Sequence, residues 1–260
     1  MSIIALIPSR SGSKRLVNKN MLSMCGKPLI YWTLTAALSS KHVSKVYIST
    51  DSPSIAKYAQ DLGAEAPFLR PRRLSQDSTL MIDVILHLLT FLEKSDKFLP
   101  DKVVLLQPTS PLRTSKDIDQ AIEHFLTTPN ADHLTSYTKL PDSLHPSKII
   151  KLDQNGFIER PENSQFLNFD TQQSNSFLIR NGPAIYISKS EALSKGMYSG
   201  NNIGYEMPWN RSIDIDTESD FQIAEFLLMN HIKKNELNNS DSLVEVVGSL
   251  DIDELDLKHE

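Results

Sequence analysis

Three short, mostly apolar runs, each separated from the next by segments with helical periodicity, constrain the fold of this chain most strongly. They cover residues 3–7, 45–50 and 102–107. Apolar runs of this length, bounded by turn signals, are typical of strands buried on both faces of a sheet. Apolar residues repeat at helical spacing in the segments 27–40, 51–63, 79–94 and 114–128. This alternation predicts an α/β fold in which a mostly parallel sheet carries helices on both faces.

The same patterns predict how the chain is divided. A chain of 260 residues usually forms one domain, or one with a small subdomain. We expect the main domain to cover residues 1–235, with a further strand at 184–189. Residues 137–180 break the repeat, and Asn155-Gly156 is a strong hairpin signal, so we predict an inserted β-rich subdomain there. Residues 236–260 carry eight acidic residues against one lysine, which favours a flexible tail, or a short appended helix, over a domain.

The loop that follows the first apolar run is strongly basic. It carries four cations, namely Arg10, Lys14, Arg15 and Lys19. The first acidic residue of the chain is Asp51, so no nearby carboxylate answers these charges. Clustered cations repel each other unless a compact anion lies among them, and a triphosphate carries about four negative charges. The small residues Ser11, Gly12 and Ser13 let main-chain N–H groups approach such an anion. The alternative is a solvated basic loop; neither a Walker motif nor a dinucleotide glycine motif can be placed here.

Two acidic residues near the end of the main domain form a candidate metal site. If residues 212–216 form a strand, Asp214 and Asp216 lie on one face of it. Two adjacent carboxylates resist ionising together unless a cation lies between them. Mg²⁺ prefers one or two carboxylates together with phosphate oxygens, so the pair would complement a triphosphate loop. In the alternative interpretation these residues only start the following helix, and for Thr217 a capping role is the preferred one.

A polar loop follows the third apolar run. It contains Gln107, Thr109 and Ser110, and the prolines at 108 and 111 stiffen the chain there. Neutral amide and hydroxyl groups suit a polyhydroxy ligand better than a phosphate. The alternative is a rigid strand–helix turn, with Thr114 or Ser115 as the helix cap.

Composition excludes several classes of partner. No apolar run reaches the roughly 18 residues that a membrane helix needs, so we expect no membrane partner. Basic charge gathers in one loop instead of spreading over a face, and the net charge is −5, so we expect no nucleic acid partner. The single cysteine, Cys25, excludes a disulfide framework within the chain and suits a cytoplasmic location.

Six segments together resemble the acylneuraminate cytidylyltransferases, the CMP-sialic acid synthetases, including their legionaminate and pseudaminate relatives. In order along the chain they read IPSRSGSKRLVNKN, ISTD, LRPRRLSQD, LLQPTSPLRT, RNGPAIYIS and SIDIDTESDF. The resemblance covers residues 3–230, approximately. It implies a Rossmann-like nucleotidyltransferase fold in which residues 137–180 form a dimerisation subdomain, and hence a homodimer. It also implies a reaction in which CTP and a nine-carbon nonulosonic acid give the CMP-sugar and pyrophosphate, with Mg²⁺ as cofactor.

The resemblance assigns roles by position. The residues implied in CTP binding are Arg10, Ser13, Lys14, Lys19, Asn20, Arg70 and Thr79. Those implied in sugar binding are Gln107, Thr109, Ser110, Asn181, Tyr186 and, from the dimerisation subdomain, Lys148. Asp214 and Asp216 match the Mg²⁺ carboxylates, and together with Arg10 and Lys19 they form the implied catalytic set. Arg15 has no counterpart in the family signature.

Three departures from the family pattern affect the sugar side. Pro183 is inserted after Asn181, the segment FDTQQSNSFLI lacks the arginine that the family offers across the dimer, and Met81 stands where a hydroxyl is usual. Thr79 is the candidate to replace that hydroxyl. N-acetylneuraminic, legionaminic and pseudaminic acids all fit this pattern. Two alternatives remain, an enzyme for KDO (3-deoxy-manno-octulosonate) or for another substrate such as a methylerythritol phosphate, and a non-catalytic protein that binds nucleotide sugars.

Overall fold

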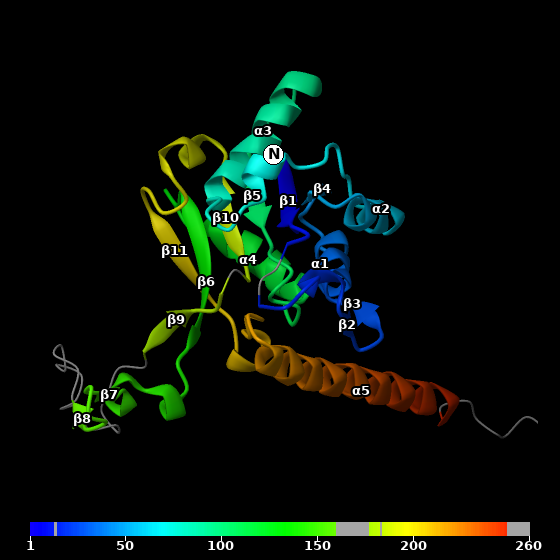
Figure 1. Ribbon diagram of the computed structural model, residues 1–260. Coiled ribbons are helices and arrows are strands. Elements are labelled where there is room, and N and C mark those ends of the chain that lie inside the picture. The colour runs from blue at the N-terminus through cyan, green and yellow to red at the C-terminus, as the bar shows by residue number, and fades with distance from the viewer. Residues whose placement is uncertain (13–14, 160–176, 183, 249–260) are drawn as a thin grey trace, which may run out of the picture.

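The computed structural model describes residues 1–12, 15–159, 177–182 and 184–248, with only the backbone course for residue 147 and for residues 235–248. Its centre is a seven-stranded sheet with the order β11-β6-β10-β5-β1-β4, and β9 pairs with β6 (Figure 1). The strands are β1 (Ile3–Pro8), β4 (Lys45–Ser49), β5 (Lys102–Leu105), β6 (His133–Lys139), β9 (Leu178–Arg180), β10 (Tyr186–Lys189) and β11 (Asn202–Glu206). The strands predicted at residues 3–7, 45–50 and 102–107 are therefore confirmed.

The sheet is mixed but mostly parallel. β1 runs parallel to both of its neighbours, β4 and β5, and β6 runs parallel to β11. β10 lies antiparallel between β5 and β6, and β9 is antiparallel to β6. The predicted strand at 184–189 exists, but its direction follows from pairing with distant strands and not from its own apolar pattern.

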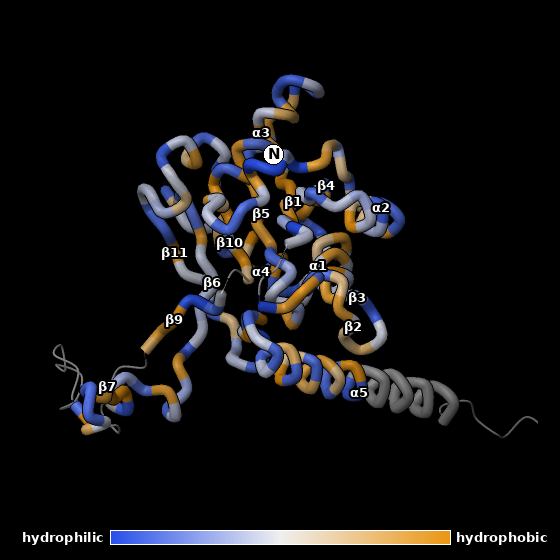
Figure 2. The backbone as a smooth tube through the Cα atoms, in the orientation of Figure 1, coloured by the Kyte–Doolittle hydropathy of each residue, from blue (hydrophilic) through white to orange (hydrophobic). Residues whose placement is uncertain are grey.

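Helices cover both faces of the sheet, as predicted. They are α1 (Leu29–Leu38), α2 (Pro53–Asp61), α3 (Met81–Ser95), α4 (Ser115–Thr127) and α5 (Glu218–Gly248). Alternate side chains of β1 face opposite layers: Ala5 and Ile7 pack with α1, α2 and α4, whereas Ile4 and Leu6 pack with α3. Hydrophobic residues accordingly follow the central strands and the covering helices in Figure 2.

Polar side chains start two of the helices, and one of them settles an open alternative. Ser52 caps α2, because its Oγ accepts the N–H of Ile55 at 3.3 Å. Thr114, and not Ser115, caps α4 through a reciprocal capping box with Asp117.

An arm extends away from the sheet beyond β6 and β9 (Figure 1). It includes the hairpin of β7 (Lys151–Leu152) and β8 (Ile158–Glu159), which turns at Asn155-Gly156 as predicted. The ends of the predicted subdomain, at residues 137–139 and 178–180, belong to strands of the central sheet. Residues 160–176 lie outside the described part of the chain, so the subdomain's remaining β structure stays a prediction.

Helix α5 differs in length from the expected terminal helix. It continues past residue 235, where we expected the acidic tail to begin, and reaches Gly248. Thr217 caps it as predicted, because its Oγ1 accepts the N–H of Asp220 at 3.3 Å. Ala224 and Leu228 pack it against Leu29 of α1. Residues 249–260 lie outside the described range, and within that range no helix is long and apolar enough to cross a membrane.

Candidate active site

A cavity of about 490 Å³ opens where β1 and β5 end. Its lining comes from the loop after β1, the loop after β5, the start of α3 and the irregular segment before α5. The lining residues are Pro8, Arg10, Gly12, Arg15, Lys19, Asn20, Arg70, Asp77, Met81, Gln107, Pro108, Thr109, Asp214 and Asp216. Ligands of α/β sheets bind at the carboxyl ends of the strands, and this cavity lies there. Segments from both ends of the main domain, far apart in the sequence, thus form one site.

The basic loop lines one wall of the cavity, but its cations are not unanswered. Arg10 Nη2 lies 2.7 Å from Asp77 Oδ1, and Arg15 Nη1 lies 2.8 Å from Asp216 Oδ2. The prediction that no carboxylate meets these charges was therefore wrong, because the partners come from distant parts of the chain. Ser13 and Lys14 lie outside the described residues, so their assignments stay predictions.

Of the three described cations of this loop, Lys19 has the least exposed side chain. Its side chain is 13% exposed, and its Nζ donates to the backbone oxygen of Ile215 at 2.6 Å and lies 3.6 Å from Asp216 Oδ1. Asn20 Nδ2 donates to the backbone oxygen of Arg10 at 3.2 Å, which holds the two ends of the loop together. Lys19 therefore presents its charge between the basic loop and the acidic wall.

The acidic wall is not a strand, contrary to our prediction. Residues 212–216 have no regular secondary structure. The N–H of Ile215 donates to Thr109 at 2.8 Å, and the oxygen of Ile215 accepts from Lys19, so the segment is held by single contacts and not by a ladder. The period of two persists nevertheless: Ile215 is fully buried, whereas Asp214 and Asp216 line the cavity.

The two carboxylates fit a divalent cation. Burial raises the pKa of Asp214, and the charge of Asp216 adds to this, whereas a hydrogen bond from Thr109 opposes it. A cation at this wall would offset that cost. Among the described residues no group of three or more His, Cys, Asp or Glu side chains could hold a metal. A pair of carboxylates suits Mg²⁺, which takes its other ligands from water and phosphate.

We expect Asp214→Asn to stabilise the protein at neutral pH. The raised pKa means that folding disfavours the ionised form, so the penalty is present above that pKa. It fades as the pH falls from the raised pKa toward the ordinary value of about 4. The free energy of unfolding should therefore be higher in the variant at pH 7, and the gap should close in acid. Urea denaturation at several pH values measures this, and a less stable variant at pH 7 would contradict the assignment.

Gly182 gives Asp214 its space. Its φ is +61°, and a Cβ built on it would lie 2.5 Å from both Cβ and Cγ of Asp214. We therefore expect Gly182→Ala to displace Asp214 and to destabilise the fold by about 2 kcal/mol. Gly26→Ala is the matched control, because Gly26 also has a positive φ (+77°) and its Cβ would meet nothing within 4 Å. Equal destabilisation of the two variants in urea denaturation would show that the contact with Asp214 does not matter.

The polar loop after β5 contributes Gln107 and Thr109 to the cavity. Ser110 differs from the prediction, because it is fully buried, and its hydroxyl has no hydrogen-bond partner among the described residues. The loop is held by the buried Arg113, which donates to Thr33 Oγ1 at 2.8 Å and to the backbone oxygens of Ala184 and Gln107. Burial lowers the pKa of Arg113 to about 9.

Two other predicted sugar residues lie at different depths. Tyr186 borders a hollow beside the main cavity, and Gln107 and Asp214 line both spaces. Asn181 is only 2% exposed and lies outside the described lining. Its Oδ1 accepts from Ser136 Oγ at 2.7 Å, and its Nδ2 donates to Ser212 Oγ at 3.0 Å, so its amide supports the wall from behind.

Of the remaining predicted residues, Arg70 lines the cavity, whereas Thr79 and Lys148 do not belong to its described lining. Arg70 lines the cavity and is 5% exposed, and burial lowers its pKa. Thr79 lies outside the described lining; its hydroxyl accepts from the N–H of Gln76 at 3.1 Å, and Met81 takes the place at the wall. Lys148 lies on the arm, where its Nζ donates to the backbone oxygen of Asp142 at 2.6 Å.

Sequence reasoning missed two charged residues of the cavity, Arg15 and Asp77. Arg15 is part of the basic loop, so its position was a usable signal, although the family signature does not require it. Asp77 follows an arginine-rich segment, residues 70–73, and nothing in the local pattern indicates that it pairs with Arg10.

The profile of the family described as "Cytidylyltransferase" matches residues 4–239. This chain belongs to that family. It is 36% identical to the CMP-N,N'-diacetyllegionaminic acid synthase of Legionella pneumophila, over 88% of this chain and 97% of the relative. It is 35% identical to the N-acylneuraminate cytidylyltransferase of Escherichia coli, over 85% of this chain but only 51% of that longer protein.

More distant relatives agree with the cytidylyltransferase assignment. The pseudaminic acid cytidylyltransferase of Campylobacter jejuni is 28% identical over 89% of this chain and 98% of its own length. A solved CMP:2-keto-3-deoxy-manno-octonic acid synthetase in complex with CTP superposes with a TM-score of 0.64 at 18% identity, over 89% of this chain and all of that one. The last comparison shows the shared fold and confirms the predicted nucleotidyltransferase architecture.

Proposed function

We propose that this cytidylyltransferase joins CTP to a nonulosonic acid, giving the CMP-sugar and pyrophosphate. The observation that carries the proposal is the cavity itself, in which Arg10 and Lys19 face Asp214 and Asp216. Such an arrangement suits a triphosphate with its metal. The substrate class is supported by the names of the relatives that share 28–36% of the sequence.

The chain's own residues would act mainly by positioning and by neutralising charge. The anomeric oxygen of the sugar attacks the α-phosphorus, the bond from that phosphorus to the bridging oxygen breaks, and pyrophosphate leaves. Lys19 would meet the charge that develops at the α-phosphate, while Arg10 and Lys14 would hold the departing pyrophosphate. Asn20 and Arg70 would bind the nucleoside. The hydroxyl proton leaves to solvent, since no described side chain is assigned as a base.

Mg²⁺ is part of this proposal. Asp214 and Asp216 would hold the ion. The ion pair between Arg15 and Asp216 would have to open when the ion binds. When bound, the ion supplies charge neutralisation on the phosphate oxygens and a lower pKa for the attacking hydroxyl.

The sugar would lie on the side of Gln107, Thr109 and Tyr186. These residues connect the main cavity with the adjoining hollow. Ser110 and Asn181 would support this side from within the protein, since both are buried.

We also propose that the arm joins two copies of the chain. Large apolar side chains on and beside it are exposed, namely Leu144, Ile149, Ile150, Leu152, Phe157, Ile158 and Leu178. An apolar surface of this kind on an extended element suits an interface between subunits. In a dimer, Lys148 would be offered to the partner's cavity. Light scattering should give twice the mass of the chain, and a monomeric mass for the active protein would contradict the proposal.

A cytoplasmic location also stays a proposal, supported by the single cysteine.

A pyrophosphate-release assay tests the function directly. The wild-type protein is incubated with CTP, UTP or ATP and with N-acetylneuraminic, legionaminic, pseudaminic or KDO acid. We expect release with CTP and at least one of the three nine-carbon acids. Release with KDO alone would favour the alternative eight-carbon substrate. Binding of CTP without release under any condition would favour the non-catalytic alternative.

A further inference from the structure

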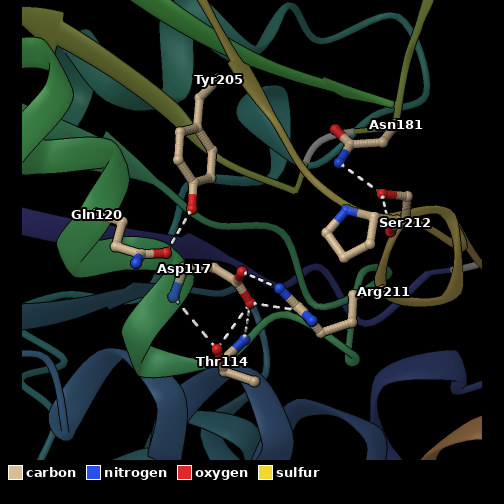
Figure 3. A network of polar contacts seen from close by, with 8 residues as sticks. Thr114, Asp117, Gln120, Asn181, Tyr205, Arg211 and Ser212 are labelled. Carbon is tan, nitrogen blue, oxygen red and sulfur yellow. Dashed lines mark hydrogen bonds and ion pairs between the residues drawn. The ribbon is translucent and has the colours of Figure 1, made fainter. Parts of the chain in front are cut away.

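A salt bridge between Arg211 and Asp117 ties the start of the acidic segment to the helix that follows the polar loop (Figure 3). Arg211 directly precedes the irregular segment 212–216, and Asp117 lies in the first turn of α4. Arg211 donates to the two oxygens of Asp117 at 3.0 Å from Nε and 2.7 Å from Nη2. The Asp117 side chain is 2% exposed and that of Arg211 is 35% exposed, so the carboxylate is shielded from water while the arginine side chain stays partly accessible.

Asp117 has a second role that connects it to the polar loop. Its Oδ2 accepts from both the N–H and the hydroxyl of Thr114, at 2.9 and 2.7 Å. Thr114 is the residue at which the loop of Gln107 and Thr109 ends and α4 begins. The capping box therefore fixes the end of that loop, and the same carboxylate holds Arg211. A capping box forms without an arginine, so helix α4 does not need the ion pair with Arg211. This ion pair instead links α4 to the segment that carries Asp214 and Asp216.

The irregular segment is thus held at several points. At the cavity, the N–H of Ile215 donates to Thr109, and four residues earlier Arg211 binds Asp117. Between these points Ser212 accepts from Asn181 and donates to the backbone oxygen of Pro208 at 2.9 Å. Since a segment without a ladder has no regular structure of its own, these contacts decide where Asp214 and Asp216 lie.

We propose that Arg211 and Asp117 are positioning residues, which fix where the two cavity carboxylates lie for a divalent cation that binds together with a nucleotide. The inference rests on the proposed function for the nature of the ligand. Neither residue contacts the cavity, so both act through the backbone of residues 212–216. Groups that hydrogen-bond directly to metal ligands typically change metal affinity or activity 10- to 100-fold when they are replaced. Arg211 and Asp117 act one step further from the carboxylates, so we expect an effect at the lower end of that range, about tenfold.

The test measures Mn²⁺ binding to the full chain in the presence of CTP, by electron paramagnetic resonance of the free ion. Arg211→Lys keeps the charge but loses the bidentate contact. We expect its Mn²⁺ affinity to fall about tenfold, with kcat falling while KM for CTP changes less than about twofold. Glu123→Gln is the matched control on the same helix, since this carboxylate pairs with His42 away from the cavity, and its Mn²⁺ affinity should equal that of wild type.

The outcomes separate positioning from simple stabilisation. If Arg211→Lys lowers only the melting temperature and binds Mn²⁺ like wild type, the inference is overturned. If Arg211→Lys does not fold, the double variant Asp117→Asn with Arg211→Gln leaves no unpaired buried charge, and the same tenfold loss is expected of it. If the wild-type protein binds CTP but no Mn²⁺, the metal site and this inference are both refuted. If the wild-type protein binds Mn²⁺ and the variants bind it equally well, only this inference is refuted and the proposed function still stands.

Discussion

Replacing Lys19 by methionine is expected to lower kcat by about 100- to 1,000-fold. Lys19 is the enclosed cation between the basic loop and the acidic wall, so its loss removes a charge from the point where phosphate charge would develop. Methionine has a similar length and keeps much of the apolar packing of the lysine stem. Single-turnover release of pyrophosphate from CTP and the sugar acid measures the effect.

Two checks separate the role of Lys19 in the reaction from its role in the fold. The methionine variant loses the hydrogen bond to Ile215, which with its charged donor is worth about 1.5–3 kcal/mol, so its melting temperature is measured alongside its rate. Lys57→Met is the matched control, because Lys57 pairs with Asp61 on the surface of α2 and should retain full activity. If Lys19→Met stays within tenfold of wild type, the assignment to the α-phosphate is wrong.

Replacement of the cavity carboxylates is the second change with a large expected effect. Asp214→Asn and Asp216→Asn should each slow the chemical step at least about tenfold, or about 1.4 kcal/mol in the barrier. Asparagine preserves size but removes the charge that would hold Mg²⁺, so higher Mg²⁺ concentrations should recover part of the loss. Turnover as a function of Mg²⁺ concentration measures both expectations.

The control for the carboxylates is Asp61→Asn, which removes the exposed partner of Lys57 and should behave as wild type. Asp216→Asn also removes the partner of Arg15, so a rise in CTP affinity without metal is expected from the freed cation. Wild-type turnover in both cavity variants would exclude them as the metal site.

Much of the fold could be predicted because its elements are locally encoded. The strands and helices follow from apolar periodicity, and the caps Ser52, Thr114 and Thr217 follow from side chains that satisfy the first turn of a helix. The direction of β10 could not be predicted, because side-chain alternation is the same in parallel and antiparallel strands. Residues 212–216 alternate like a strand but have no neighbouring strand to pair with, so the pattern alone was misleading.

The sequence could predict which residue types belong to the site, but not which of them pair or how their side chains are oriented. The basic loop and the two carboxylates were identified from charge and spacing, and the structure brings them to one cavity. Their ion pairs, such as Arg10 with Asp77, join residues far apart in the sequence and left no local signal. A sequence motif also does not show which way a side chain points. The side chain of Asn181 was expected to face the sugar, but it is buried and hydrogen-bonded to Ser136, a strand residue 45 positions away.

The central claim, that the cavity transfers CMP from CTP to a nonulosonic acid, is tested most directly by the fate of labelled CTP. The wild-type protein is incubated with the acid that it accepts and with CTP labelled at either the α- or the γ-phosphorus. We predict that the α label appears in the sugar nucleotide and the γ label in pyrophosphate, in equal amounts. Release of the γ label as inorganic phosphate, or an α label that stays in free nucleotide while the acid is unchanged, would contradict the account.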